Sequence, residues 1–128
     1  MRTRVLLPSE FNLPAQLHAD MEMPYQMPDV SSPLFAVRIG AFNNDRMRGC
    51  LLVKIIGEAF LLLDPAMGEA EKSRALVLLD HHGRMTAKAK GFDEASAWPP
   101  PEVEPWFTPA LEHLGWCKSP WPNWSIAL

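Results

Sequence analysis

Residues 34–63 read LFAVRIGAFNNDRMRGCLLVKIIGEAFLLL, and this aliphatic stretch decides the fold. Two turn signals interrupt it. Asn43-Asn44-Asp45 tolerates a tight reversal, and Gly57-Glu58 places glycine first, as a two-residue type II′ turn requires. The pattern therefore predicts an antiparallel meander of three strands, at Leu34–Phe42, Gly49–Ile56 and Ala59–Leu63.

The first turn also predicts a register. If Phe42 pairs with Arg48, the odd-numbered residues of the first two strands share one face, and the second turn extends that face into the third strand. All its side chains are apolar, so we predict it as the core layer: Phe35, Val37, Ile39, Ala41, Leu51, Val53, Ile55, Phe60 and Leu62. The opposite face receives the basic residues Arg38, Arg48 and Lys54.

Composition divides the chain into three regions of one globular domain, residues 1–128. These are a Pro-punctuated N-terminal segment (1–33), the sheet body (34–90) and a Trp/Pro-rich C-terminal segment (97–128). The predicted fold is α+β, with an antiparallel sheet of four to six strands, two or three short helices, and the C-terminal segment packed over the sheet. We also predict a strand at Val5–Leu7, one or two helical turns over Pro14–Asp20, and a short helix that opens at Thr108-Pro109 and closes at Gly115.

Residues 64–90 admit two interpretations. The preferred one places a short helix near 65–73, a buried strand at Ala75–Asp80 and an edge strand at Arg84–Lys90, where polar and apolar residues alternate strictly. The alternative is one helix from 65 to 82, capped by Gly83.

Charge and composition exclude several classes of protein. Twelve Lys and Arg against fifteen Asp and Glu give a formal net charge of −3, which argues against a general nucleic-acid binder. The longest apolar run is too short to span a membrane, and the N-terminus lacks the apolar core of an export signal. We therefore expect a cytoplasmic protein whose Cys50 and Cys117 are reduced thiols. The sequence carries no nucleophile or nucleotide-binding motif, so we expect no cofactor and favour a protein that is not an enzyme.

Asp80-His81-His82 follows an apolar run and resembles the strand-then-DHH motif of the DHH phosphoesterases. The resemblance covers three residues and implies a metal-dependent hydrolase in which they bind the metal. The further aspartate motifs of that family are absent from this sequence, and the competing interpretation is a polar turn facing water. Two other metal sets are weaker, because no spacing supports them. They are a zinc set of Cys50, His113, Cys117 and His81 or His82, and a copper set of His18, Met21, Met23 and Met27.

The basic residues offer a nucleic-acid alternative. Arg38, Arg48 and Lys54 share a predicted sheet face, while Lys88 and Lys90 share the polar side of the predicted edge strand. If the two strips adjoin, they form a surface for phosphates. The competing interpretation is edge protection and solubility.

The C-terminal segment holds all five tryptophans of the chain. Either they pack on the sheet and complete the core, or the outer ones stay exposed and anchor a partner protein; the two interpretations can coexist. We predict a small protein-binding module of the adaptor, inhibitor or immunity type. The partner is another protein, with a second copy of the chain as a further candidate, nucleic acid less expected and no membrane. The predicted binding residues are Trp98, Pro100, Trp106, Trp121 and Trp124.

Overall fold

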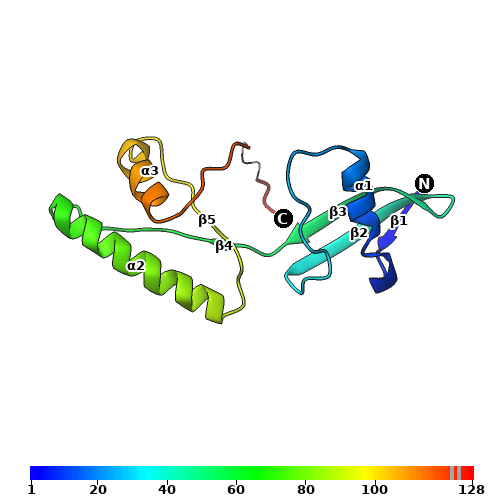
Figure 1. The fold of residues 1–128 in the computed structure, drawn as a ribbon, viewed down its shortest axis with the longest axis horizontal. Coiled ribbons are helices and arrows are strands. Elements are labelled where there is room, and N and C mark those ends of the chain that lie inside the picture. Colours follow the sequence, from blue (N-terminus) through cyan, green and yellow to red (C-terminus); the bar gives the residue numbers. More distant parts are fainter. Residues whose placement is uncertain (122, 124) are drawn as a thin grey trace. The chain divides into compact units, whose positions relative to one another are not determined.

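The computed structural model describes residues 1–121, 123 and 125–128 (Figure 1). Its contacts divide the chain into two compact units, Met1–Ile56 and Gly57–Leu128. Both units combine helices with strands, so the predicted α+β class is confirmed. The boundary falls inside the region that we assigned to a single sheet body, and the single domain over residues 1–128 stays a prediction.

The first unit is built on a three-stranded antiparallel sheet in the order β1-β2-β3, where β1 is Arg2–Val5, β2 is Phe35–Asn43 and β3 is Arg46–Lys54. Asn44 and Asp45 connect β2 to β3 with φ values of 48° and 64°. Two consecutive positive φ values define a type I′ turn, whose twist matches that of the flanking strands. The predicted first turn is therefore confirmed, and Figure 1 shows the hairpin that it closes.

The predicted register of this hairpin holds over most of its length. The confirmed pairs are Val37–Val53 and Ile39–Leu51. At Phe42 the prediction is wrong, because a register shift after Ala41 pairs Phe42 with Met47. Arg48 is the extra residue at this irregularity, which has the form of a β-bulge.

The third strand of the sheet differs from the predicted one. Residues 59–63 contain no strand, and Gly57–Glu58 is itself a short strand (β4) instead of a turn. β1 takes the third place and pairs antiparallel with β2, so that Val5 faces Ile39. The predicted strand at Val5–Leu7 lies too far along the chain, because Pro8 opens a 3-10 helix, η1 (Pro8–Glu10), directly after it.

The core of the first unit lies on the face of the sheet that we predicted to be basic. Leu6, Val30, Phe35 and Phe42 are buried there, and α1 (Leu13–Asp20) contributes Pro14. Gly40 permits this packing, since a Cβ at its position would lie 2.6 Å from the Phe42 ring and 2.7 Å from Leu6 Cδ2. The helix predicted over Pro14–Asp20 is confirmed.

The predicted core layer is largely the open face of this unit. Phe35 is buried, and a register shift separates it from Val37. Leu51 is 62% exposed, Val53 is 44% exposed and Ile55 is exposed, whereas Val37, Ile39 and Ala41 are half-buried. Phe60 and Leu62 are exposed too, but they belong to the second unit. The prediction of this layer as the core is wrong, because the N-terminal segment packs on the other face and satisfies Arg38 there.

The second unit contains α2 (Glu69–Ala89), α3 (Glu104–His113) and two short strands, β4 and β5 (Ala95–Ser96), which pair in parallel. The predicted sheet of four to six strands is therefore matched only in part, by the three-stranded sheet of the first unit. Gly115 follows α3 with a φ of +88°, as predicted for its end. The predicted start at Thr108-Pro109 is wrong, because α3 begins at Glu104 with Pro105 in its first turn.

α2 overturns the preferred interpretation of residues 64–90. Its single run contains both segments that we predicted as strands, and it passes through Gly83 instead of ending there. The alanines, leucines and long charged residues of this segment have high helix propensity, and Ala87 and Ala89 are poor strand formers. Glu69 and Glu71 in the first turn and Lys88 in the last turn suit the helix dipole. Within the described part of the chain, no helix is long and apolar enough to cross a membrane.

Candidate functional site

Two tryptophans are fixed to helix α2. Trp106 donates its indole N–H to Glu69 Oε2 at 3.1 Å, and Trp116 donates to Asp80 Oδ1 at 2.8 Å. The Arg84 guanidinium lies 5.7 Å from the centre of the Trp116 ring. Of the predicted binding residues, Trp106 is therefore tied to Glu69 of α2 by one hydrogen bond.

Two other tryptophans are presented to solvent. Trp98 is 48% exposed and Trp121 is 58% exposed. Pro100 is exposed too, and its carbonyl accepts the N–H groups of Val103 and Glu104 at 3.0 and 3.1 Å, at the start of α3. The prediction for Trp124 lies outside the described residues. Trp106 is 36% exposed despite its bond to Glu69, so the accessible part of the predicted surface is Trp98, Pro100, Trp106 and Trp121.

Arg38, the first residue of the predicted basic face, is a structural residue. Its Nε donates to the Val30 carbonyl at 2.7 Å, and its Nη2 donates to the Ser32 carbonyl at 2.6 Å. Its guanidinium also lies 4.8 Å from the centre of the Phe11 ring. Through these contacts Arg38 holds the segment before β2 against the sheet.

Arg48 and Lys54, the other basic residues of the predicted sheet face, lie in different surroundings from Arg38. Arg48 lines an open groove of about 620 Å³ beside α1, together with Arg46 and the acidic residues Asp20 and Asp45. Its charge is therefore surrounded by charges of both signs. Lys54 is half-buried at the end of β3.

Lys88 and Lys90 lie at the end of α2, in the second unit. The edge strand that was to place them beside the basic sheet face does not form. The nucleic-acid alternative required the two strips to adjoin on one sheet, and it stays an untested hypothesis.

Asp80, His81 and His82 lie in the middle of α2, so the strand that should precede a DHH-type motif is absent here. Asp80 Oδ1 accepts the Trp116 indole N–H, and Asp80 Oδ2 pairs with Arg84 Nε at 2.9 Å. Asp80 therefore joins α2 to the segment after α3. His81 and His82 are exposed.

The two other metal hypotheses gain no geometric support. Across residues 1–121, 123 and 125–128, no three His, Cys, Asp or Glu side chains form a group that could hold a metal ion. Cys50 and Cys117 are thiols of different units, and burial raises the pKa of the Cys50 thiol. In the predicted copper set, the His18 ring lies edge-on to Tyr25 at 4.8 Å, and Met21 is 59% exposed.

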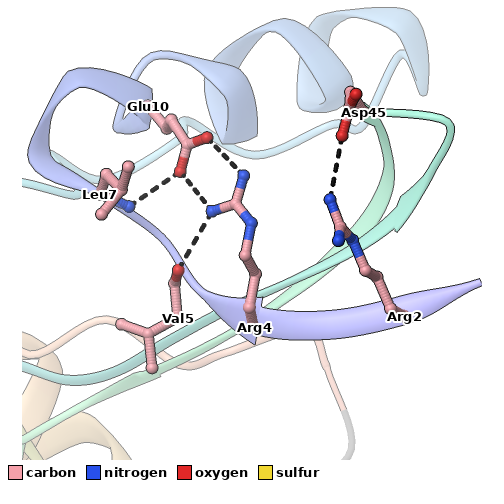
Figure 2. A network of polar contacts seen from close by, with 6 residues as sticks. All are labelled: Arg2, Arg4, Val5, Leu7, Glu10 and Asp45. Carbon is pink, nitrogen blue, oxygen red and sulfur yellow. Dashed lines mark hydrogen bonds and ion pairs between the residues drawn. The ribbon is translucent and has the colours of Figure 1, made fainter.

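Sequence reasoning missed an ion pair that fixes the N-terminus (Figure 2). Two nitrogens of Arg4 donate to the two oxygens of Glu10, both at 2.7 Å, and Glu10 Oε2 also accepts the Leu7 N–H at 2.8 Å. The bonds from Arg4, and then the bond from Leu7, lower the pKa of Glu10 to about 2. The Arg4 guanidinium also lies 4.0 Å from the centre of the Phe42 ring. Two features of the sequence could have indicated this ion pair: a basic residue near the N-terminus, Arg4, and a glutamate two residues after Pro8.

The comparisons with known proteins returned no family model, no curated protein and no solved structure that matches the chain.

Proposed function

We propose that this chain is a non-enzymatic module that binds another protein, with Trp98 and Trp121 as its apolar anchors. The observation that supports the proposal is the contrast among the tryptophans. Trp106 and Trp116 donate their indole N–H groups to α2, and Trp106 is 36% exposed; Trp98 and Trp121 are more exposed, at 48% and 58%. Tryptophan is enriched among the residues that dominate binding energies at protein interfaces.

Proline gives both anchors a stiff backbone. Trp98 directly precedes Pro99, and Trp121 lies between Pro120 and Pro122 in the sequence. Proline restricts the backbone before binding, so less conformational entropy is lost when the tryptophan enters a partner's pocket. The proposal extends to Pro100 and Trp124, keeps the cytoplasmic location expected from the sequence, and leaves adaptor, inhibitor and immunity roles as its variants.

The experiment uses the tagged, full-length chain to capture partners from a lysate of its host. The affinity of the recovered protein is then measured for the wild type and for the double variant Trp98→Ala/Trp121→Ala. We expect the double variant to bind at least about 30-fold more weakly, because an anchoring tryptophan contributes about 2 kcal/mol or more. Its far-UV circular dichroism should remain that of the wild type.

Phe60→Ala is the matched control, because Phe60 is an aromatic residue that is 80% exposed and lies outside the tryptophan-rich segment. This variant should bind the partner as the wild type does. Unchanged affinity in the double variant would contradict the proposal. Loss of its native dichroism would also contradict it, since the two side chains would then belong to the core.

A further inference from the structure

One face of α2 carries a stripe of six exposed residues, two apolar and four polar or charged. The positions recur at alternating intervals of three and four residues, which places them on one face of the helix. All six are exposed, including Leu78 at 64% and Met85 at 61%. We call this set the α2 stripe: Glu71, Arg74, Leu78, His81, Met85 and Lys88.

The second unit uses the other side of the same helix for its own packing. Leu76 is the buried residue of α2, Glu69 accepts the Trp106 indole, and Asp80 accepts the Trp116 indole. With 3.6 residues per turn, successive residues are about 100° apart, so these three positions lie roughly opposite the α2 stripe. The internal contacts of the unit thus leave the stripe available.

The α2 stripe is complementary to itself when its direction is reversed. In an antiparallel pair of identical helices related by a two-fold axis, Glu71 of one copy faces Lys88 of the other, and this ion pair occurs twice. Leu78 then lies beside His81 at the axis, and the aliphatic part of Arg74 covers Met85. A parallel pair would instead place Glu71 against Glu71 and Lys88 against Lys88, which repel.

The residues that flank the stripe also suit the antiparallel arrangement. Ala70, Ala75 and Ala89 flank the stripe. Their small side chains let the two helices approach closely. Val77, which is 49% exposed, adds apolar surface next to Leu78. No two like charges face each other in this register.

We propose that two copies of this chain associate through antiparallel pairing of their α2 helices along the α2 stripe. The self-complementary charge order selects a second copy as the occupant, because a two-fold interface requires one surface to match itself. The interface has few apolar residues per copy, which places it among small, readily dissociating contacts. It shares no residue with the surface of Trp98 and Trp121.

The test is sedimentation equilibrium of the purified full-length chain from about 1 µM to about 1 mM. Glu71→Lys and Lys88→Glu should each weaken dimerisation about tenfold, because each converts both symmetry-related attractions into repulsions. The double variant Glu71→Lys/Lys88→Glu exchanges the two charges, so its dimerisation should return to within about threefold of the wild type. A mixture of the two single variants should form heterodimers, in which one ion pair of each orientation is restored.

Lys90→Glu is the matched control. It makes the same charge change at the same end of the helix, but its position lies off the stripe, and its dimerisation should equal that of the wild type. A chain that stays monomeric throughout the series overturns the proposal. So does a dimer that Lys88→Glu leaves intact, or a double variant that is no better than the single ones. The variant Trp98→Ala/Trp121→Ala should still dimerise, which separates this proposal from the preceding one.

Discussion

Arg38 shows how a charged side chain can belong to the covered face of a sheet. Two carbonyl oxygens and the face of an aromatic ring surround its guanidinium, and its charge is thereby compensated. Gly40 lies two residues further along the same strand. Because glycine has no side chain, Leu6 and Phe42 occupy the space that a Cβ would fill. The packing of the N-terminal segment on β2 therefore depends on an arginine and a glycine as much as on aliphatic residues.

Gly40→Ala should destabilise the protein by about 1–3 kcal/mol, because the new methyl group would overlap the Phe42 ring and Leu6 and force them to move. Urea unfolding followed by circular dichroism measures the change. Gly49→Ala is the control: its new methyl group would meet no atom within 4 Å, so its effect should stay within about 0.5 kcal/mol. Equal effects of the two substitutions would show that Gly40 is not a close contact.

The ion pair of Arg4 and Glu10 predicts a pH dependence of stability. Glu10 has a pKa of about 2 in the folded protein, below its ordinary value of 4.5. The ionised Glu10 therefore contributes fully to the free energy of unfolding above pH 4.5, and this contribution is lost as the pH falls towards 2.

Urea midpoints across this pH range measure that contribution. Glu10→Gln should lower the midpoint at neutral pH and make it fall less steeply in acid than in the wild type. Glu102→Gln removes an exposed carboxylate of the second unit and should keep the wild-type slope. Parallel curves for the wild type and Glu10→Gln would contradict the role assigned to this carboxylate.

At the scale of elements, the hairpin was predictable and the helix was not. The turn residues and the alternation of β2 and β3 define a register, and the pairs around Val37 and Ile39 follow from it. Which face is covered depends on where residues 6–33 pack, and alternation alone carries no information about that. In residues 84–90, alternation favoured a strand, but the preference of alanine and the long charged residues for a helix prevailed.

The candidate site also has a part that the sequence could predict and a part that it could not. Trp98 and Trp121 are exposed and Trp116 is half-buried, while the binding role of the tryptophans stays a prediction. The attachment of Trp106 and Trp116 to α2 could not be foreseen, since it requires Glu69 and Asp80 to lie on one face of a continuous helix.

The continuity of α2 through Gly83 predicts opposite effects for two glycine substitutions. Gly83→Ala should stabilise the protein by about 1 kcal/mol, since glycine is unfavourable inside a helix and the position is open. Gly91→Ala should destabilise it, because Gly91 has a φ of +94°, where alanine is strained. Thermal unfolding and mean-residue ellipticity measure both changes. A loss of helicity in Gly83→Ala would contradict a continuous helix.

At the scale of the whole molecule, the distribution of apolar side chains is unusual. Among the described residues of the second unit, Leu76 is the one large apolar side chain that is buried. Four apolar neighbours on the same helix are exposed: Val77, Leu78, Leu79 and Met85. The first unit likewise leaves Val5, Leu51 and Val53 of its sheet exposed. Surfaces of this kind are typical of chains that work in contact with another protein or another copy. The α2 stripe and the exposed tryptophans belong to this pattern.

The placement of aromatic residues also gives the protein two built-in optical reporters. All five tryptophans lie beyond residue 97, so their fluorescence follows the second unit alone. The single tyrosine, Tyr25, packs against His18 in the first unit. Excitation at the long-wavelength edge, where tryptophan alone absorbs, reports on the second unit, and Tyr25 is followed through its emission at shorter wavelength than that of tryptophan. Unfolding curves from the two chromophores that coincide on heating are what a single cooperative domain requires.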